Sequence, residues 1–125
     1  ELRSGFLRNE NGRFEFVPFA PMLQVAPILE LLPHDFDGDG REEILAAGNY
    51  FGVKPYQGRL DSFQGALIGG ENKILLANRT GLDLMHQSVR RLEVIRMGQK
   101  PYLLVVFNDA PAAVYELTNT KIAYP

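Results

Sequence analysis

Short apolar or alternating runs, separated by turn residues, extend along most of the chain. Residues 13–17 alternate between polar and apolar side chains, which favours a half-buried strand. Seven further runs have the length and composition of strands; they are residues 28–32, 43–47, 65–69, 73–77, 89–97, 102–107 and 112–117. No window of about 11 to 18 residues has a helical period. The pattern therefore predicts an all-β chain.

Turn residues mark the joins between these runs. Asn11-Gly12 is a strong signal for a two-residue hairpin turn. Residues 70–72 predict a tight hairpin, and residues 98–101 and 108–111 join the last three strands. Prolines interrupt residues 19–26, which we expect to form a crossover instead of a central strand. Residues 102–107 are apolar on both faces, as expected for an interior strand.

An acidic loop lies between the runs 28–32 and 43–47, with the sequence Asp35-Phe36-Asp37-Gly38-Asp39-Gly40-Arg41-Glu42-Glu43. The carboxylates of Asp35, Asp37 and Asp39 can turn inward together only if the backbone coils tightly. Gly38 and Gly40 supply the conformational freedom that such coiling needs. Without a cation these carboxylates would repel one another. The loop is therefore the candidate centre of a metal site.

The spacing of the loop fits calcium. With Asp35 as position one, Asp37 and Asp39 fall at three and five, Arg41 offers its backbone carbonyl at seven, and Glu43 falls at nine. This set approaches the six or more oxygen ligands that Ca²⁺ takes. We predict that these five residues bind Ca²⁺.

Several neighbouring features limit that prediction. An EF-hand needs a bidentate Glu at position twelve and helical flanks, but position twelve is Ala46 and the flanks are strands. His34 is expected to be a capping or solvent-facing residue, because imidazole is not a preferred ligand of a hard cation. Glu42 and Glu43 are adjacent on a strand and face opposite ways, so they do not form an acid and base pair.

The irregular stretch 49–64 is expected to be a long loop held at one end by the metal site.

Composition and charge exclude several classes. The chain has 125 residues, enough for one domain or part of one, and a net charge of −2 that gives no footprint for nucleic acid. It has no cysteine, so disulfides, thiolate metal sites and cysteine nucleophiles are excluded. No apolar run reaches the length of a membrane span. The serines and histidines have no hydrolase spacing, so we expect no enzyme activity. The first residue, Glu1, suggests a processed or excised piece of a longer protein.

Two further groups of residues leave alternatives open. The aromatic residues of the irregular stretch are Tyr50, Phe51, Tyr56 and Phe63. They cover a core or form a surface that stacks on sugars or binds protein. Arg90 and Arg91 favour a structural, cross-strand role over anion binding.

The runs repeat at about the size of a four-stranded propeller blade. Residues 28–80 give one complete antiparallel blade with the calcium loop. Residues 1–27 give the end of a preceding blade, and residues 81–125 give most of a final blade. A propeller needs about four to eight blades. We therefore expect a partial β-propeller with parts of two neighbouring blades and exposed edges.

The acidic loop together with Ile44-Leu45-Ala46-Ala47-Gly48-Asn49 resembles the FG-GAP/VCBS repeat of integrin α-type β-propellers. The wider resemblance is to the C-terminal segment of long FG-GAP/VCBS proteins of Bacteroidetes. It is carried by Gly12-Arg13-Phe14, Gln24, Gly48-Asn49-Tyr50, Gly58-Arg59-Leu60-Asp61, Gly65, Ser88-Val89-Arg90 and Asn108. It implies the propeller fold, the calcium loop and an extracytoplasmic location, secreted, periplasmic or at the cell surface. The chain departs from the family at Glu43, where Asp is usual, and in the charge pair Arg41-Glu42.

The expected function is a non-catalytic, calcium-binding interaction or structural module of a secreted or cell-surface protein. Its partners would be the remaining blades of a longer parent protein, or a second copy through exposed blade edges, and an extracellular protein or glycan ligand. An alternative is an accessory part of an extracellular enzyme or glycan-processing protein whose active site lies outside this chain. A third possibility is a structural blade without metal.

Overall fold

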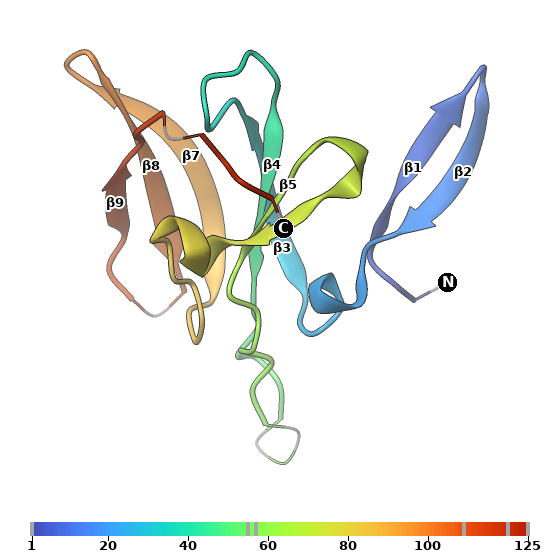
Figure 1. Cartoon of the computed structure of the whole chain (residues 1–125). Helices are drawn as coiled ribbons and strands as arrows, with labels where there is room; N and C mark the ends of the chain where they lie inside the picture. Colours follow the sequence, from blue (N-terminus) through green and yellow to red (C-terminus); the bar gives the residue numbers. More distant parts are fainter. Residues whose placement is uncertain (1, 55, 57, 109, 120, 125) are drawn as a thin grey trace.

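Antiparallel β-sheets account for the regular structure of the chain (Figure 1). The computed structural model describes residues 2–54, 56, 58–108, 110–119 and 121–124, and over these residues it contains strands and short 3-10 turns but no α-helix. The strands form three sheets, none of them closed, with the orders β1-β2, β3-β4-β5-β6 and β7-β8-β9. The all-β prediction is therefore confirmed. Over the same residues the structure has no helix long and apolar enough to cross a membrane.

The first sheet is a hairpin of β1 (Gly5–Glu10) and β2 (Arg13–Pro18). Its two-residue turn has positive φ at both Asn11 and Gly12, the geometry that matches the twist of paired strands. The sequence pattern predicted β2 and the turn but did not single out β1, because β1 ends in three polar residues and has no alternation. The hairpin stands apart from the other sheets (Figure 1).

The second sheet contains β3 (Ile28–His34), β4 (Glu43–Gly48), β5 (Ala66–Ile68) and β6 (Ile74–Leu76). Strand β3 runs two residues beyond the predicted run and includes Pro33. An edge strand tolerates this residue, which has no amide hydrogen to donate. Gly48 packs closely against the backbone just before β3. A Cβ at Gly48 would collide with the carbonyl oxygen of Pro27. The turn between β5 and β6 is the 3-10 turn η3 (Gly70–Asn72), at the position that the sequence predicted.

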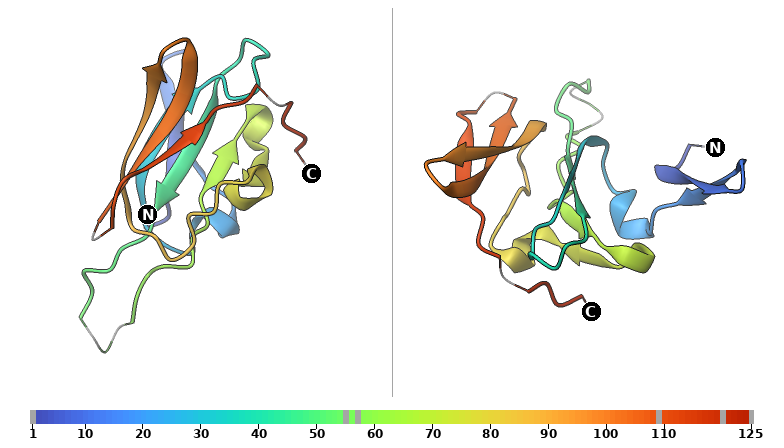
Figure 2. Two further views of the ribbon diagram at one scale, coloured as in Figure 1. Left: turned by 90° about the vertical axis from the view of Figure 1, so that its left-hand side faces the viewer. Right: turned by 90° about the horizontal axis from the view of Figure 1, so that it is seen from above.

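The third sheet contains β7 (Val89–Met97), β8 (Lys100–Phe107) and β9 (Ala113–Glu116). Strand β8 lies in the middle, as its apolar residues predicted. The link between β8 and β9 was predicted at 108–111, and its residue 109 lies outside the described residues. Buried side chains of the second and third sheets form one core, which includes Leu45, Leu67, Leu92 and Leu103. This shared core holds the two sheets side by side (Figure 2).

The irregular stretch 49–64 leaves β4 at the end opposite to the acidic loop (Figure 2). The expectation that the metal site holds one end of it is therefore wrong. An antiparallel bridge between Tyr50 and Leu60 closes its neck. The side chain of Asn49 then fixes its return to the core, donating to the carbonyl of Phe63 at 2.8 Å and accepting from the amide of Phe63 at 2.9 Å. Two further 3-10 turns among the described residues are η1 (Pro21–Leu23), in the predicted crossover, and η4 (Ala77–Thr80), after β6.

Candidate metal centre

The acidic loop connects β3 to β4, and hydrogen bonds to its own backbone shape it. Asp35 Oδ1 accepts the amides of Gly38 and Asp39 at 2.7 and 3.1 Å, and Asp35 Oδ2 accepts the amide of Gly40 at 3.0 Å. Gly38 and Gly40 have φ of 76° and 87°, so both use the conformational freedom that the predicted coiling needs. The loop coils around the side chain at its first position.

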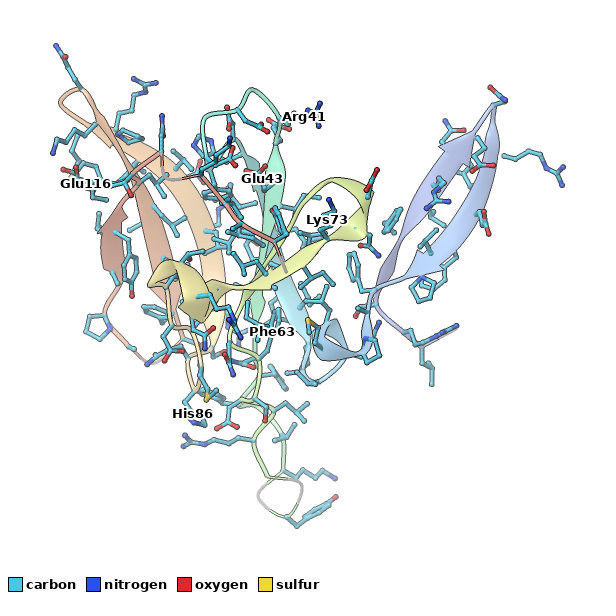
Figure 3. The ribbon with its side chains drawn as sticks, viewed as in Figure 1. Arg41, Glu43, Phe63, Lys73, His86 and Glu116 are labelled. Atoms are coloured by element: carbon cyan, nitrogen blue, oxygen red, sulfur yellow. The ribbon has the colours of Figure 1, made fainter. Side chains whose placement is uncertain are left out.

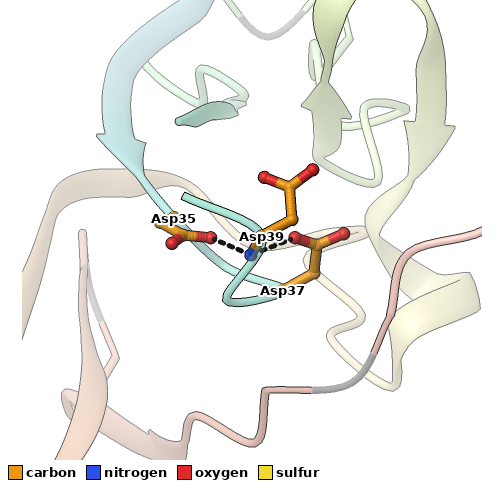
Figure 4. A group of neighbouring side chains, drawn as sticks. All are labelled: Asp35, Asp37 and Asp39. Atoms are coloured by element: carbon orange, nitrogen blue, oxygen red, sulfur yellow. Dashed lines mark hydrogen bonds between the residues drawn. The ribbon is translucent and has the colours of Figure 1, made fainter. Parts of the chain in front are cut away.

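The carboxylates of Asp35, Asp37 and Asp39 converge (Figure 4). One ligand oxygen from each lies within 4.8 Å of the others; the first two side chains are half-buried and Asp39 is exposed. Ca²⁺ binds oxygen at about 2.3–2.6 Å, so ligands on opposite sides of one ion lie up to about 5 Å apart. The spacing of the three oxygens therefore fits a single ion.

Glu43 lies at the base of the loop and is buried, with 6% of its surface exposed. Its Oε2 accepts the amide of Phe36 at 3.0 Å, which ties the end of the loop to its beginning. Burial raises the pKa of Glu43 above its ordinary value, and the hydrogen bond from Phe36 lowers it; the charges of Asp37, Asp39 and Asp35 raise it further. The carboxyl is therefore close enough to the three aspartates to interact electrostatically, although it is not one of the three convergent groups.

Arg41 contacts the acidic cluster through its backbone and not through its side chain. Its backbone amide donates to Asp39 Oδ1 at 2.8 Å, and its side chain extends away from the molecule at the tip of the loop (Figure 3). Glu42 is exposed and Glu43 is buried, so these neighbours do face opposite ways. Of the five predicted ligands, the structure brings together three carboxylates, with Glu43 beneath them.

The segment after β9 crosses to the acidic loop, which the sequence did not predict. We call its described residues, 117–119 and 121–124, the β9 tail. The amide of Ile122 donates to Asp37 Oδ2 at 3.3 Å, and Asn119 lies against Gly38. Hydrogen bonds between residues 85 positions apart leave no local pattern, so periodicity could not reveal this contact.

Tyr124 ends the tail beside the same carboxylates. Its hydroxyl oxygen is buried and has no hydrogen-bond partner among the described residues. Burial raises the pKa of Tyr124 to about 12, and the negative charges of Glu43, Asp37 and Asp39 contribute to the shift. A group bound beside the acidic cluster would supply the partner that this buried hydroxyl oxygen lacks.

The other candidate residues do not form a second centre in the described part of the chain. His34 packs edge-on against Phe36, with ring centroids 5.1 Å apart. His86 Nδ1 lies 3.2 Å from Asp61 Oδ2 on an exposed loop. Arg91 pairs with Glu93 at 2.8 Å and with Glu30 of β3 at 3.3 Å, the cross-strand role that was expected.

The four aromatic residues of the stretch 49–64 lie in different environments. Phe63 is buried in the core, as the covering role predicted. Tyr56 is 79% exposed, and the Lys54 ammonium lies 5.9 Å from its ring centroid. Phe51 and Tyr50 lie under the guanidinium groups of arginines 59 and 90. The stretch thus presents aromatic surface at its outer end and core contacts at its neck.

Comparison with known proteins adds no relative. No protein-family model, no curated protein and no solved structure matches the chain.

Proposed function

We propose that the chain is a non-catalytic, calcium-stabilised interaction module of a secreted or cell-surface FG-GAP/VCBS protein. The observation that carries the proposal is the convergence of Asp35, Asp37 and Asp39, whose ligand oxygens lie within 4.8 Å of one another. Like charges at this separation oppose the folded loop unless a cation neutralises them. The all-oxygen donor set and the irregular loop favour Ca²⁺ over Mg²⁺, which demands near-ideal octahedral geometry.

The ligand set that we propose is the carboxylates of Asp35, Asp37, Asp39 and Glu43 with the backbone carbonyl of Arg41. Glu43 is buried beneath the cluster, and the charges of all three aspartates act on it. A buried carboxylate is costly unless a positive charge balances it. Bound Ca²⁺ would supply that charge and would tie β3 to β4.

We further propose that the three sheets are parts of three propeller blades. The four-stranded sheet within residues 28–80 corresponds to a complete blade, the hairpin within 1–27 to the end of a preceding blade, and the sheet within 81–125 to most of a final blade. The sheet sizes of two, four and three strands and the core shared by the second and third sheets support this arrangement. The extracytoplasmic location rests on the wider resemblance of the chain to the C-terminal segment of FG-GAP/VCBS proteins of Bacteroidetes.

The partners that we propose are the remaining blades of a longer parent protein or a second copy of the chain. Leu7, Phe14 and Phe16 of the β1-β2 hairpin are exposed by 64%, 67% and 36%. Apolar side chains on an open two-stranded sheet mark a surface that association would cover.

A second candidate is an accessory part of an extracellular enzyme or glycan-processing protein. The exposed ring of Tyr56 favours it, because exposed aromatic side chains stack on sugars. Binding of an oligosaccharide panel, lost in Tyr56→Ala, would support this candidate.

Isothermal titration calorimetry with Ca²⁺ tests the main proposal. We expect one site, with affinity reduced about tenfold or more in Asp37→Asn and Asp39→Asn, because each change removes a charged ligand. Glu42→Gln is the matched control: it removes one negative charge from the same loop, but at an exposed side chain that is not one of the convergent carboxylates. Equal binding by wild type and Asp37→Asn would contradict the proposal, as would the absence of binding at millimolar Ca²⁺.

A further inference from the structure

The β9 tail passes beside the acidic loop and contacts it at Asp37 and Gly38. It begins as a continuation of the third sheet, where the amide of Leu117 donates to the carbonyl of Pro101 at 3.1 Å. It then crosses to the second sheet, with Leu117 and Ile122 packed against the shared core. Figure 4 shows the trace of this segment passing the loop that carries the aspartates. The tail therefore links the third sheet to the candidate metal centre.

One backbone hydrogen bond joins the tail to a proposed ligand. The amide of Ile122 donates to Asp37 Oδ2, while Asp37 Oδ1 accepts the amide of Asp39 at 3.1 Å. A carboxylate has about four lone-pair positions, so these bonds orient Asp37 and leave it able to bind an ion. Outer partners of this kind fix the orientation of a ligating carboxylate.

The ring of Tyr124 packs directly against Gly69. A Cβ added at Gly69 would lie 2.5 Å from both Cζ and the hydroxyl oxygen of Tyr124, so only a residue without a side chain leaves room for the ring. The hydroxyl oxygen is buried without a partner, and the carboxylates of Glu43, Asp37 and Asp39 act on it electrostatically. The ring is thus packed against Gly69, within electrostatic reach of the acidic side chains.

We propose that the β9 tail is a positioning element of the cation site, so that seating of Tyr124 on Gly69 and binding of the cation strengthen each other. This inference rests on the proposed calcium function. The tail orients Asp37 through the Ile122 amide, and the cation in turn removes the repulsion among the carboxylates that this hydrogen bond holds in place. Such coupling is reciprocal. A change that displaces the tail weakens cation binding by the same factor by which cation binding stabilises the packed tail.

Gly69→Ala and Gly70→Ala are a matched pair that separates this role from general destabilisation. Both add one methyl group in the same β5-β6 turn region, but a Cβ at Gly70 meets nothing within 4 Å. Neither position has a φ in the left-handed region that disfavours alanine. We expect Gly69→Ala to weaken Ca²⁺ binding in calorimetry by about tenfold. Gly70→Ala should bind as wild type does.

Terbium luminescence supplies a readout that a merely structural effect would not reproduce. The chain has no tryptophan, so tyrosines are the sensitisers of a bound Tb³⁺. We expect tyrosine-excited Tb³⁺ emission in wild type, a several-fold loss in Tyr124→Phe with Tb³⁺ affinity retained, and a similar loss in Gly69→Ala. Emission should be unchanged in Tyr115→Phe, a tyrosine of β9 that packs on the core.

The outcomes distinguish the two proposals. If wild type binds Ca²⁺ but Gly69→Ala and Gly70→Ala bind equally well, the positioning role of the tail is overturned and the calcium site stands. Full emission from Tyr124→Phe likewise overturns it. If wild type binds neither Ca²⁺ nor Tb³⁺, the proposed function itself fails and the inference fails with it.

Discussion

Asn49 anchors two connections to the end of β4 with one side chain. Its Nδ2 donates to the carbonyls of Phe63, Leu84 and Gln87, its Oδ1 accepts the amide of Phe63, and it is 1% exposed. Its φ of 72° also places it in the left-handed region that asparagine tolerates. Partners lying 14 to 38 residues away make this role invisible to local sequence patterns.

Replacement of Asn49 tests the anchoring role. Asn49→Gly keeps the backbone geometry and removes the bonds, so we expect the free energy of unfolding to fall by about 3 kcal/mol in a denaturant titration. Asn11→Gly is the matched control, since Asn11 also has positive φ but is exposed in a hairpin turn. Equal losses in the two variants would contradict the anchoring role.

Glu43 makes the stability of the metal-free chain depend on pH. Its pKa is raised in the folded chain, chiefly by burial, so the folded state holds the proton more tightly than the unfolded state does. The resulting stabilisation is fully present below the ordinary pKa of 4.5 and is lost as pH rises through the raised value. In chelator, the stability of wild type relative to Glu43→Gln should therefore fall as pH rises from 4.5. Parallel curves for the two proteins would refute this.

At the scale of elements, local signals predicted the hairpins and the acidic loop. The Asn11-Gly12 turn, the apolar run of β8 and the glycines of the loop each act through backbone preferences of adjacent residues. Strand β1 and the β9 tail were not predicted. The second half of β1 is exposed and polar, and the tail is held by contacts with residues far away in sequence. The sequence also predicted that the metal site holds one end of the stretch 49–64; instead Asn49 holds it through partners 14 to 38 residues away, which local patterns do not reveal.

Gly48 is the element-scale position where the chain has no room for a side chain. Because a Cβ there would collide with the backbone carbonyl of Pro27, Gly48→Ala must displace either β4 or the crossover before β3. We expect a loss of about 2 kcal/mol or more in the free energy of unfolding, measured by denaturant titration. Gly70→Ala, with open space around it, should lose nothing. An unchanged free energy of unfolding in Gly48→Ala would show that the crossover moves freely.

At the scale of the whole molecule, open sheets leave apolar surface uncovered. The most exposed aromatic side chain of the β1-β2 hairpin is Phe14. If this face mediates self-association, Phe14→Lys should shift the average mass in sedimentation experiments toward that of one chain. Met97→Lys adds the same charge at an exposed apolar residue of β7 and should leave association unchanged. An identical concentration dependence in wild type and both variants would remove the hairpin as the contact surface.

Calcium-dependent thermal stability tests the central claim most directly. The purified chain is melted in millimolar Ca²⁺ and in chelator, together with Asp37→Ala and Asp39→Ala. An ion at about a thousand times its dissociation constant adds about 4 kcal/mol to the free energy of unfolding. For a chain of this size that corresponds to a Tm increase of about 10–20 °C. We predict this shift for wild type and its loss in both variants. A wild-type Tm that is the same with Ca²⁺ and with chelator would contradict a calcium-stabilised module.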